Sequence, residues 1–176
     1  MANLLPSTYL TILVAFLAVA SGVIFFQIFR TRKTESQLSK LLSKLSKEKG
    51  TAQDLYQLGS IYLEKKLFNQ AAVYLKKALR AQDLEDTEGF ARISNALGYA
   101  YFAQEQYDLA IRQYKEALKA MPKYVVALNN LGHAYERKQL ASQALETYEK
   151  SLKHDPKNST AKRRADSLRK RLAPSS

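Results

Sequence analysis

The feature that most constrains the fold is a motif that recurs at a fixed distance along the chain. Six positions between residues 97 and 122 carry the same residue type again 34 positions later. The matched pairs are Leu97 and Leu131, Gly98 and Gly132, Tyr101 and Tyr135, Ala110 and Ala144, Tyr114 and Tyr148, and Pro122 and Pro156. A constant period of this length indicates a stack of small supersecondary units, because one such unit cannot bury its apolar face alone.

A weaker third copy precedes these two. Its residues hold the same internal spacings and are Leu58, Gly59, Tyr62, Ala71, Leu75 and Ala78. The step from Gly59 to Gly98 is 39 residues instead of 34, so residues 86–90 are predicted to lengthen the connection between the first and second copies.

Each copy is predicted to form two helices joined by a short turn, because its apolar residues recur at helical spacing. Small residues stand where the two helices of a copy would approach closely, since a larger side chain there would overpack the contact. These predicted packing positions are Gly59, Ala71, Gly98, Ala110, Gly132 and Ala144. Pro122 and Pro156 follow the second helices and would end them.

The order Leu-Gly, a Tyr three residues on, and then Ala, an aromatic residue, Ala and Pro resembles the tetratricopeptide repeat (TPR) family. The resemblance implies an all-α fold in which residues 52–85, 91–124 and 125–158 are three repeats of an α-solenoid. The chain departs from the family pattern where Leu55, Ser94 and Leu128 replace an early Trp, Asp83 replaces a Pro and Ser151 replaces an Ala. Residues 159–172 are predicted to cap the stack with a final helix that is apolar on one side and basic elsewhere.

A membrane span is predicted near the N-terminus, after a short tail of residues 1–8. Residues 9–29 carry no formal charge, and a helix of this length would be about 32 Å long, enough to cross a hydrocarbon core of about 30 Å. A cleaved signal peptide is the alternative, but no Lys or Arg precedes the apolar run and the run exceeds the usual core length. Basic residues gather on the C-terminal side of the span, which predicts an N-terminus on the lumenal or outer side and repeats in the cytoplasm or stroma.

Residues 30–50 are predicted to form a basic amphipathic linker helix. Leu38, Leu41, Leu42 and Leu45 make an apolar stripe among lysines and serines. Three arrangements stay open: the linker rests on the bilayer surface, packs against the first repeat as its N-terminal cap, or is a solvated stalk. The segment Thr51-Ala-Gln-Asp is predicted to start the next helix with a capping box.

The formal net charge of +12 is concentrated at the two ends of the chain. Residues 51–156 hold 14 basic and 13 acidic side chains, whereas residues 157–176 hold 7 basic and 1 acidic. This distribution does not favour nucleic acid as a partner, because it offers no continuous basic groove for a phosphate backbone. The chain has two histidines, no cysteine and no glycine-rich phosphate loop, so no catalytic, metal or cofactor site is expected and the chain is not expected to be an enzyme.

Recognition of another protein is the function that remains. In TPR proteins the first helices of successive repeats line a concave groove, so the resemblance implies groove positions with aromatic, amide and charged side chains suited to binding a peptide. These predicted binding residues are Tyr56, Ser60, Asn95, Tyr99, Phe102, Asn129, His133 and Arg137. The carboxylate clamp of chaperone-docking members is not expected, because Tyr56, Ser60, Ala96, Val126 and Asn130 occupy its positions.

The layout as a whole is similar to one small TPR family. A Leu-Leu-Pro start, an N-terminal span, a basic stalk and three repeats in 176 residues resemble the cyanobacterial and plastid family first called hypothetical chloroplast reading frame thirty-seven. The resemblance implies a thylakoid scaffold that binds photosystem I subunits or other assembly factors. A bacterial envelope scaffold and an organellar targeting receptor are the alternatives, since both would share the anchor and the repeats.

Overall fold

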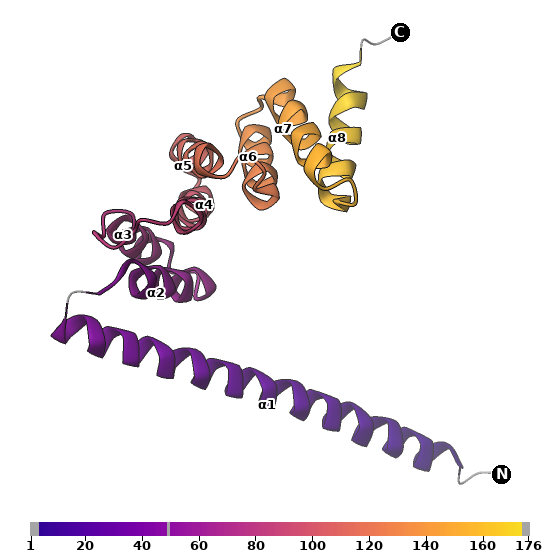
Figure 1. The fold of residues 1–176 in the computed structure, drawn as a ribbon. Coiled ribbons are helices and arrows are strands. Elements are labelled where there is room, and N and C mark those ends of the chain that lie inside the picture. Colours follow the sequence, from indigo (N-terminus) through magenta and orange to yellow (C-terminus); the bar gives the residue numbers. More distant parts are fainter. Residues whose placement is uncertain (1–3, 49, 174–176) are drawn as a thin grey trace. The chain divides into compact units, whose positions relative to one another are not determined.

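The computed structural model describes residues 4–48 and 50–173. Its eight helices form two compact units, one ending at Glu48 and one beginning at Lys49, and each is described by itself (Figure 1). Within the described residues, every buried side chain belongs to the second unit, between Ala52 and Leu168. The second unit therefore has a hydrophobic core of its own.

The first unit is the single helix α1, Leu4–Lys47. Residues 4–8 of the predicted tail and residues 30–47 of the predicted linker continue the helix of the 9–29 span without interruption. Residues 1–3 and 49 lie outside the described residues. Residues 23–47 contain no Gly or Pro that would break the helix. Pro6 lies in the first helical turn, where its missing N–H has no intrahelical partner to lose. By length and composition α1 is able to cross a membrane.

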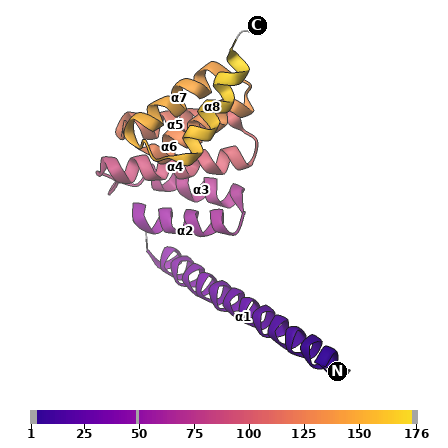
Figure 2. The same cartoon turned by 90° about the vertical axis from the view of Figure 1, so that its right-hand side faces the viewer.

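The second unit is a stack of seven helices, seen in two views in Figures 1 and 2. They are α2 (Ala52–Glu64), α3 (Phe68–Ala78), α4 (Thr87–Ala103), α5 (Tyr107–Ala120), α6 (Val125–Arg137), α7 (Ala141–His154) and α8 (Ser159–Leu172). The helices pack in the pairs α2–α3, α4–α5 and α6–α7, and α8 packs on α7. Each second helix also contacts the first helix of the next pair.

Each helix pair is held together by a glycine on the first helix and a large side chain on the second. A Cβ added to Gly98 would lie 2.6 Å from Tyr114 Cε1, and a Cβ on Gly132 would lie 2.8 Å from Tyr148 Cε1. In the first pair, Leu75 takes the place of the tyrosine and would meet a Cβ on Gly59 at 2.7 Å. Close helix contact, and not backbone flexibility, therefore requires glycine at these positions.

Helix α4 begins earlier than the repeat pattern indicates. It has 17 residues, against 13 in α2 and 13 in α6, and it starts at Thr87. The Asp86 carboxylate caps it by accepting hydrogen bonds from the backbone N–H groups of Glu88 at 2.9 Å and Gly89 at 2.8 Å. Residues 87–90 therefore extend α4 and do not belong to the connection, in which the sequence analysis placed them. The connection itself, residues 79–86, is still longer than residues 121–124, which join α5 to α6.

The start of α2 confirms the predicted capping box. Thr51 Oγ1 accepts a hydrogen bond from the Asp54 N–H at 3.1 Å, and Asp54 Oδ2 accepts one from the Thr51 N–H at 3.2 Å. A second carboxylate from far along the chain joins them, since Asp83 accepts from the Ala52 N–H at 3.0 Å. The Asp that replaces the usual Pro at position 83 thus closes the first helix pair by capping α2.

The turn inside each helix pair holds one residue in the left-handed region. Lys66, Glu105 and Gln139 have φ values of 58°, 59° and 58°, and none of them is glycine. An L-residue pays about 1–2 kcal/mol for this conformation, whereas glycine adopts it freely.

Replacing Gln139 with glycine is therefore expected to stabilise the stack by about 0.5–1 kcal/mol, after allowing for the larger unfolded-state entropy of glycine. Urea unfolding of residues 50–176, followed by circular dichroism, measures the change. Lys138→Gly is the matched control, because Lys138 has a φ of −84° and gains nothing from glycine. Equal effects of the two substitutions would contradict the strain argument.

Candidate peptide-binding groove

The first helices of the pairs form the inner wall of the stack. Helix α4 contacts both α2 and α6, whereas α3 and α5 contact chiefly the first helices on either side of them. Close spacing of first helices and wider spacing of second helices curve such a stack, with the first helices on the concave side. The eight predicted binding residues all lie on α2, α4 and α6. Five of them belong to two clusters of side chains, and the other three lie outside both clusters.

One group is an aromatic cluster at the α4–α6 end of this wall, formed by Phe102, Tyr107, His133 and Arg137. The Phe102 ring centroid lies 4.7 Å from that of His133 and 5.4 Å from that of Tyr107. The Arg137 guanidinium lies 5.0 Å from the centre of the Tyr107 ring and 3.5 Å from Glu105. The cluster offers flat apolar surface beside a cation, which suits an aromatic or aliphatic side chain of a partner.

His133 is neutral in this cluster at neutral pH. Burial lowers the pKa of His133, and the nearby positive charge of Arg164 lowers it further. The negative charge of Glu136 raises the pKa, and the positive charge of Arg137 lowers it. The imidazole therefore acts as a ring with one N–H donor and one acceptor.

Acidification is expected to destabilise the stack through His133. Because its pKa is lower in the folded chain than the ordinary value of 6.5, the folded state binds fewer protons there than the unfolded state. The stabilisation is complete above the unfolded pKa and is lost as the pH falls through the folded pKa. His133→Phe keeps a ring against Phe102 and removes the titrating group.

The melting temperature of the wild type should accordingly fall more steeply between about pH 7 and pH 5 than that of His133→Phe. His154→Phe serves as the control, since His154 is exposed at the end of α7 and lies outside the cluster. Parallel curves for the wild type and His133→Phe would exclude this role for His133.

A hydrogen-bonded network anchors the C-terminal end of the wall. The Tyr148 hydroxyl donates to one Glu136 oxygen at 2.6 Å, and Arg164 donates to the other at 3.2 Å. Burial raises the pKa of Tyr148, and the hydrogen bond to Glu136 raises it further, so the hydroxyl stays protonated. One carboxylate thus connects α6, α7 and α8 and fixes the direction of Glu136 and Arg164 at the groove edge.

The second group is a polar cluster between α2, α4 and α6, formed by Tyr56, Arg92, Asn95, Tyr124 and Asn130. Asn130 Nδ2 donates to Asn95 Oδ1 at 2.9 Å. Burial raises the pKa of Tyr124, the neighbouring Tyr56 adds to the rise, and Arg92 and Asn95 oppose it. The groups that influence Tyr124 belong to α2 and α4, and the hydrogen bond from Asn130 links Asn95 to α6, so the cluster joins all three first helices.

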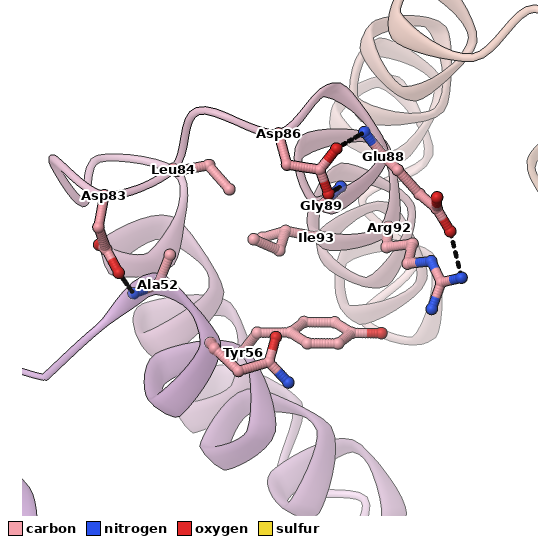
Figure 3. A pocket seen from close by; sticks show the side chains of 10 residues that line it. Ala52, Tyr56, Asp83, Leu84, Asp86, Glu88, Gly89, Arg92 and Ile93 are labelled. Atoms are coloured by element: carbon pink, nitrogen blue, oxygen red, sulfur yellow. Dashed lines mark hydrogen bonds and ion pairs between the residues drawn. The ribbon is translucent and has the colours of Figure 1, made fainter.

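A pocket of about 440 Å³ opens beside this cluster, between the start of α2 and the start of α4 (Figure 3). The Tyr56 ring extends from α2 toward Arg92, which forms an ion pair with Glu88 one helical turn earlier. Asp83 and Asp86 border the pocket, and both carboxylates are engaged in capping helices. Glu88 and Gly89, from the added first turn of α4, also line the pocket.

The remaining predicted binding residues differ in their surroundings. Tyr99 is 45% exposed, and its ring meets Phe68 edge-on at a centroid distance of 6.4 Å. Asn129 turns toward α7, where its Oδ1 accepts a hydrogen bond from the buried Ser151 hydroxyl at 2.7 Å. Ser60 is half-buried on α2. Asn129 thus supports the packing of its own helix pair, whereas Tyr99 is open to a partner.

Several residues of the site were not among the eight predicted binding residues, and they include Arg92, Tyr107, Tyr124, Asn130 and Arg164. Arg92 is on α4 one turn before Asn95, so the helical spacing of the groove positions contains the signal for it. Tyr107 begins a second helix, Tyr124 precedes α6, and Arg164 belongs to α8, and no repeat spacing places these with the first helices. Within residues 4–48 and 50–173, no group of three or more His, Asp or Glu side chains is arranged to hold a metal ion.

Comparisons with known proteins agree with this architecture. The sequence profile described as TPR repeat matches residues 98–139, and the profile described as tetratricopeptide repeat matches residues 55–83 and 125–158. The crystal structure of MamA is similar with a TM-score of 0.72 and 25% identity, over 80% of each chain. The first TPR of Spaghetti (RPAP3), bound to an HSP90 peptide, has a TM-score of 0.64 and 21% identity over 70% of this chain and 94% of its own, which shows the common fold. The protein is an α-solenoid of the TPR class.

Similar sequences show to which family of TPR proteins the chain belongs. The chain is 36% identical to ycf37 of Guillardia theta over 74% of this chain and 73% of the relative, and 33% identical to ycf37 of Pyropia yezoensis over 94% and 96%. It is also 33% identical to the chloroplastic TPR domain-containing protein PYG7 of Arabidopsis thaliana, over 94% of this chain and 54% of that protein. The chain belongs to the ycf37 family, as the layout of span and repeats predicted.

Proposed function

We propose that this protein is a membrane-anchored TPR scaffold that holds protein partners during the assembly of photosystem I. Membership of the ycf37 family supports the proposal, since the resemblance that predicted this family implies a role with photosystem I at the thylakoid. The observation that carries the binding function is the exposed Tyr99, flanked on the inner wall by the aromatic cluster and the polar cluster.

The anchor is helix α1. Apolar side chains around its circumference are exposed, among them Phe16, Phe25 and Phe26 at 69%, 73% and 67%. A helix that exposes so many large apolar side chains is stable only when lipid or protein covers it. The basic residues that follow the span would hold the N-terminus on the lumenal or outer side and the stack on the stromal or cytoplasmic side.

The groove chemistry fits a protein segment that combines an apolar side chain with polar backbone. The aromatic cluster would take the apolar side chain, while Asn95, Asn130 and Arg92 present donors and acceptors to a peptide backbone. Aromatic and arginine side chains commonly dominate the affinity of such interfaces. The described residues of this wall include both types at exposed positions, namely Tyr99, Arg92 and Arg137.

Affinity capture of the tagged full-length chain from gently solubilised membranes, followed by mass spectrometry, tests the proposal. Photosystem I subunits or their assembly factors should co-purify with the wild type, and the double variant Tyr99→Ala/Arg137→Ala should lose them by about tenfold or more. The control Leu109→Ala/Arg112→Ala removes equivalent exposed side chains from α5 and should retain them. Unchanged photosystem I levels in a deletion strain, or capture of imported precursors in place of photosystem I proteins, would contradict the proposal.

A further inference from the structure

The last helix presents a charged surface that the groove does not use. Helix α8 buries Ala161, Ala165 and Leu168 against the preceding helix. The rest of its circumference carries six basic side chains and the single acid Asp166. Four of the basic residues form what we call the basic end face, and all four are exposed: Lys162, Arg163, Lys170 and Arg171.

The charge of the basic end face is not compensated within the described part of the chain. Arg169 pairs with Glu149 at 2.9 Å and with Asp166 at 2.8 Å, and Arg164 pairs with Glu136 at 3.2 Å. No ion pair within residues 4–48 and 50–173 involves any of the four residues of the end face. An excess of positive charge at one end of a nearly neutral stack is a surface for an anionic partner.

The composition of this surface favours lipid head groups over a protein. Residues 159–172 contain no aromatic residue, and of their apolar side only Leu172 is exposed, since Ala161, Ala165 and Leu168 are buried. Protein interfaces have cores rich in Tyr, Trp and Phe and poor in Lys. Attraction of a polybasic surface to anionic head groups needs neither an apolar anchor nor a fixed pairing geometry, and contributes through the number of charges alone.

We propose that the basic end face of α8 lies against an anionic lipid surface and forms a second membrane contact, which rests on the proposed anchoring by α1. Tethering through α1 keeps the local concentration of lipid high, so a contact that is weak in isolation is effective in the intact chain. The contact would fix one end of the stack at the bilayer and set the direction in which the groove opens.

The natural chain has no cysteine, so a single cysteine at Ser167 on α8 can carry a fluorescent donor in the full-length protein. Energy transfer to an acceptor lipid is measured in phosphatidylcholine vesicles with and without phosphatidylglycerol. We expect stronger transfer in the anionic vesicles and loss of the increase at about 1 M salt, where the screening length falls to about 3 Å. The variant Lys162→Gln/Arg163→Gln/Lys170→Gln/Arg171→Gln should abolish the increase.

Removing the same charge elsewhere is the matched control. Lys66→Gln/Lys115→Gln/Lys123→Gln/Lys153→Gln replaces four exposed lysines outside α8 and should leave the increase intact. In flotation of residues 50–176 with anionic vesicles, the α8 variant should lower the partition coefficient by a factor on the order of 1,000, and the control variant by much less.

Two outcomes would overturn the proposal. One is equal energy transfer in neutral and anionic vesicles. The other is a donor that responds to a poly-glutamate peptide but not to anionic lipid, which would assign the face to an acidic protein. Carbonate extraction of the same vesicles tests the α1 anchor separately, so failure of the anchor and failure of the α8 contact are distinguishable.

Discussion

Replacement of Gly98 by valine is expected to lower the free energy of unfolding of the stack by about 3 kcal/mol. The first added carbon would already lie 2.6 Å from Tyr114 Cε1, and Tyr114 is buried with 1% exposure, so the ring has no free space to enter. Helix α4 would have to move away from α5 and open the core between them. Alanine at the same position should cost less, because its higher helix propensity returns up to about 1 kcal/mol.

A double-mutant cycle with Tyr114→Ala tests this explanation by urea unfolding of residues 50–176. Tyr114→Ala alone should cost about 3–5 kcal/mol because it leaves a cavity. In the double variant the valine fills part of that cavity, so the combined loss should be smaller than the sum by about 1–3 kcal/mol. Additive losses, or a Gly98→Val variant as stable as the wild type, would show that the glycine is not required by the contact with Tyr114.

The second large effect concerns the membrane anchor. Thirteen of the residues in the 9–29 span are Leu, Ile, Val or Phe, which together favour insertion by about 4–8 kcal/mol. Two arginines near the centre of the span oppose insertion by about 5–7 kcal/mol. Phe16→Arg/Val19→Arg is therefore expected to transfer most of the protein from the membrane pellet to the soluble fraction in carbonate extraction.

Phe16→Leu/Val19→Leu is the control for this substitution, and it should remain in the pellet with the wild type. A wild-type chain that washes off with carbonate would refute the anchor directly. Retention of the arginine variant would mean that contacts outside the span hold the protein on the membrane.

Sequence periodicity predicts the stack well because the same contact, a glycine against a large side chain, recurs in each helix pair. Gly98, Gly132 and their tyrosine partners recur at the same spacing, and the spacing specifies which helices meet. Periodicity carries less information where the chain departs from it. The connection before the second repeat is longer, as predicted, but it is formed by residues 79–86, because Asp86 caps α4 and residues 87–90 belong to that helix.

Long-range polar contacts could not be derived from the sequence. Asp83 caps a helix that starts 31 residues earlier, and Asn130 meets Asn95 across 35 residues. Either pairing depends on how two segments that are distant in the sequence approach in space, which residue spacing alone does not specify. Ser94 is a related case, since it is fully buried at the position of the family Trp and its hydroxyl has no hydrogen-bond partner within the described residues.

Site-specific photocrosslinking tests most directly the claim that the inner wall of the stack binds a protein partner. A photoreactive phenylalanine analogue is placed at Tyr99 or at Leu109 in the full-length chain, and native membranes are irradiated. Both side chains are exposed, but Tyr99 lies on the first helix of its pair and Leu109 on the second. We expect crosslinks to photosystem I subunits or assembly factors from position 99 and none from position 109. Crosslinks from position 109 alone, or the same products from both positions, would contradict it.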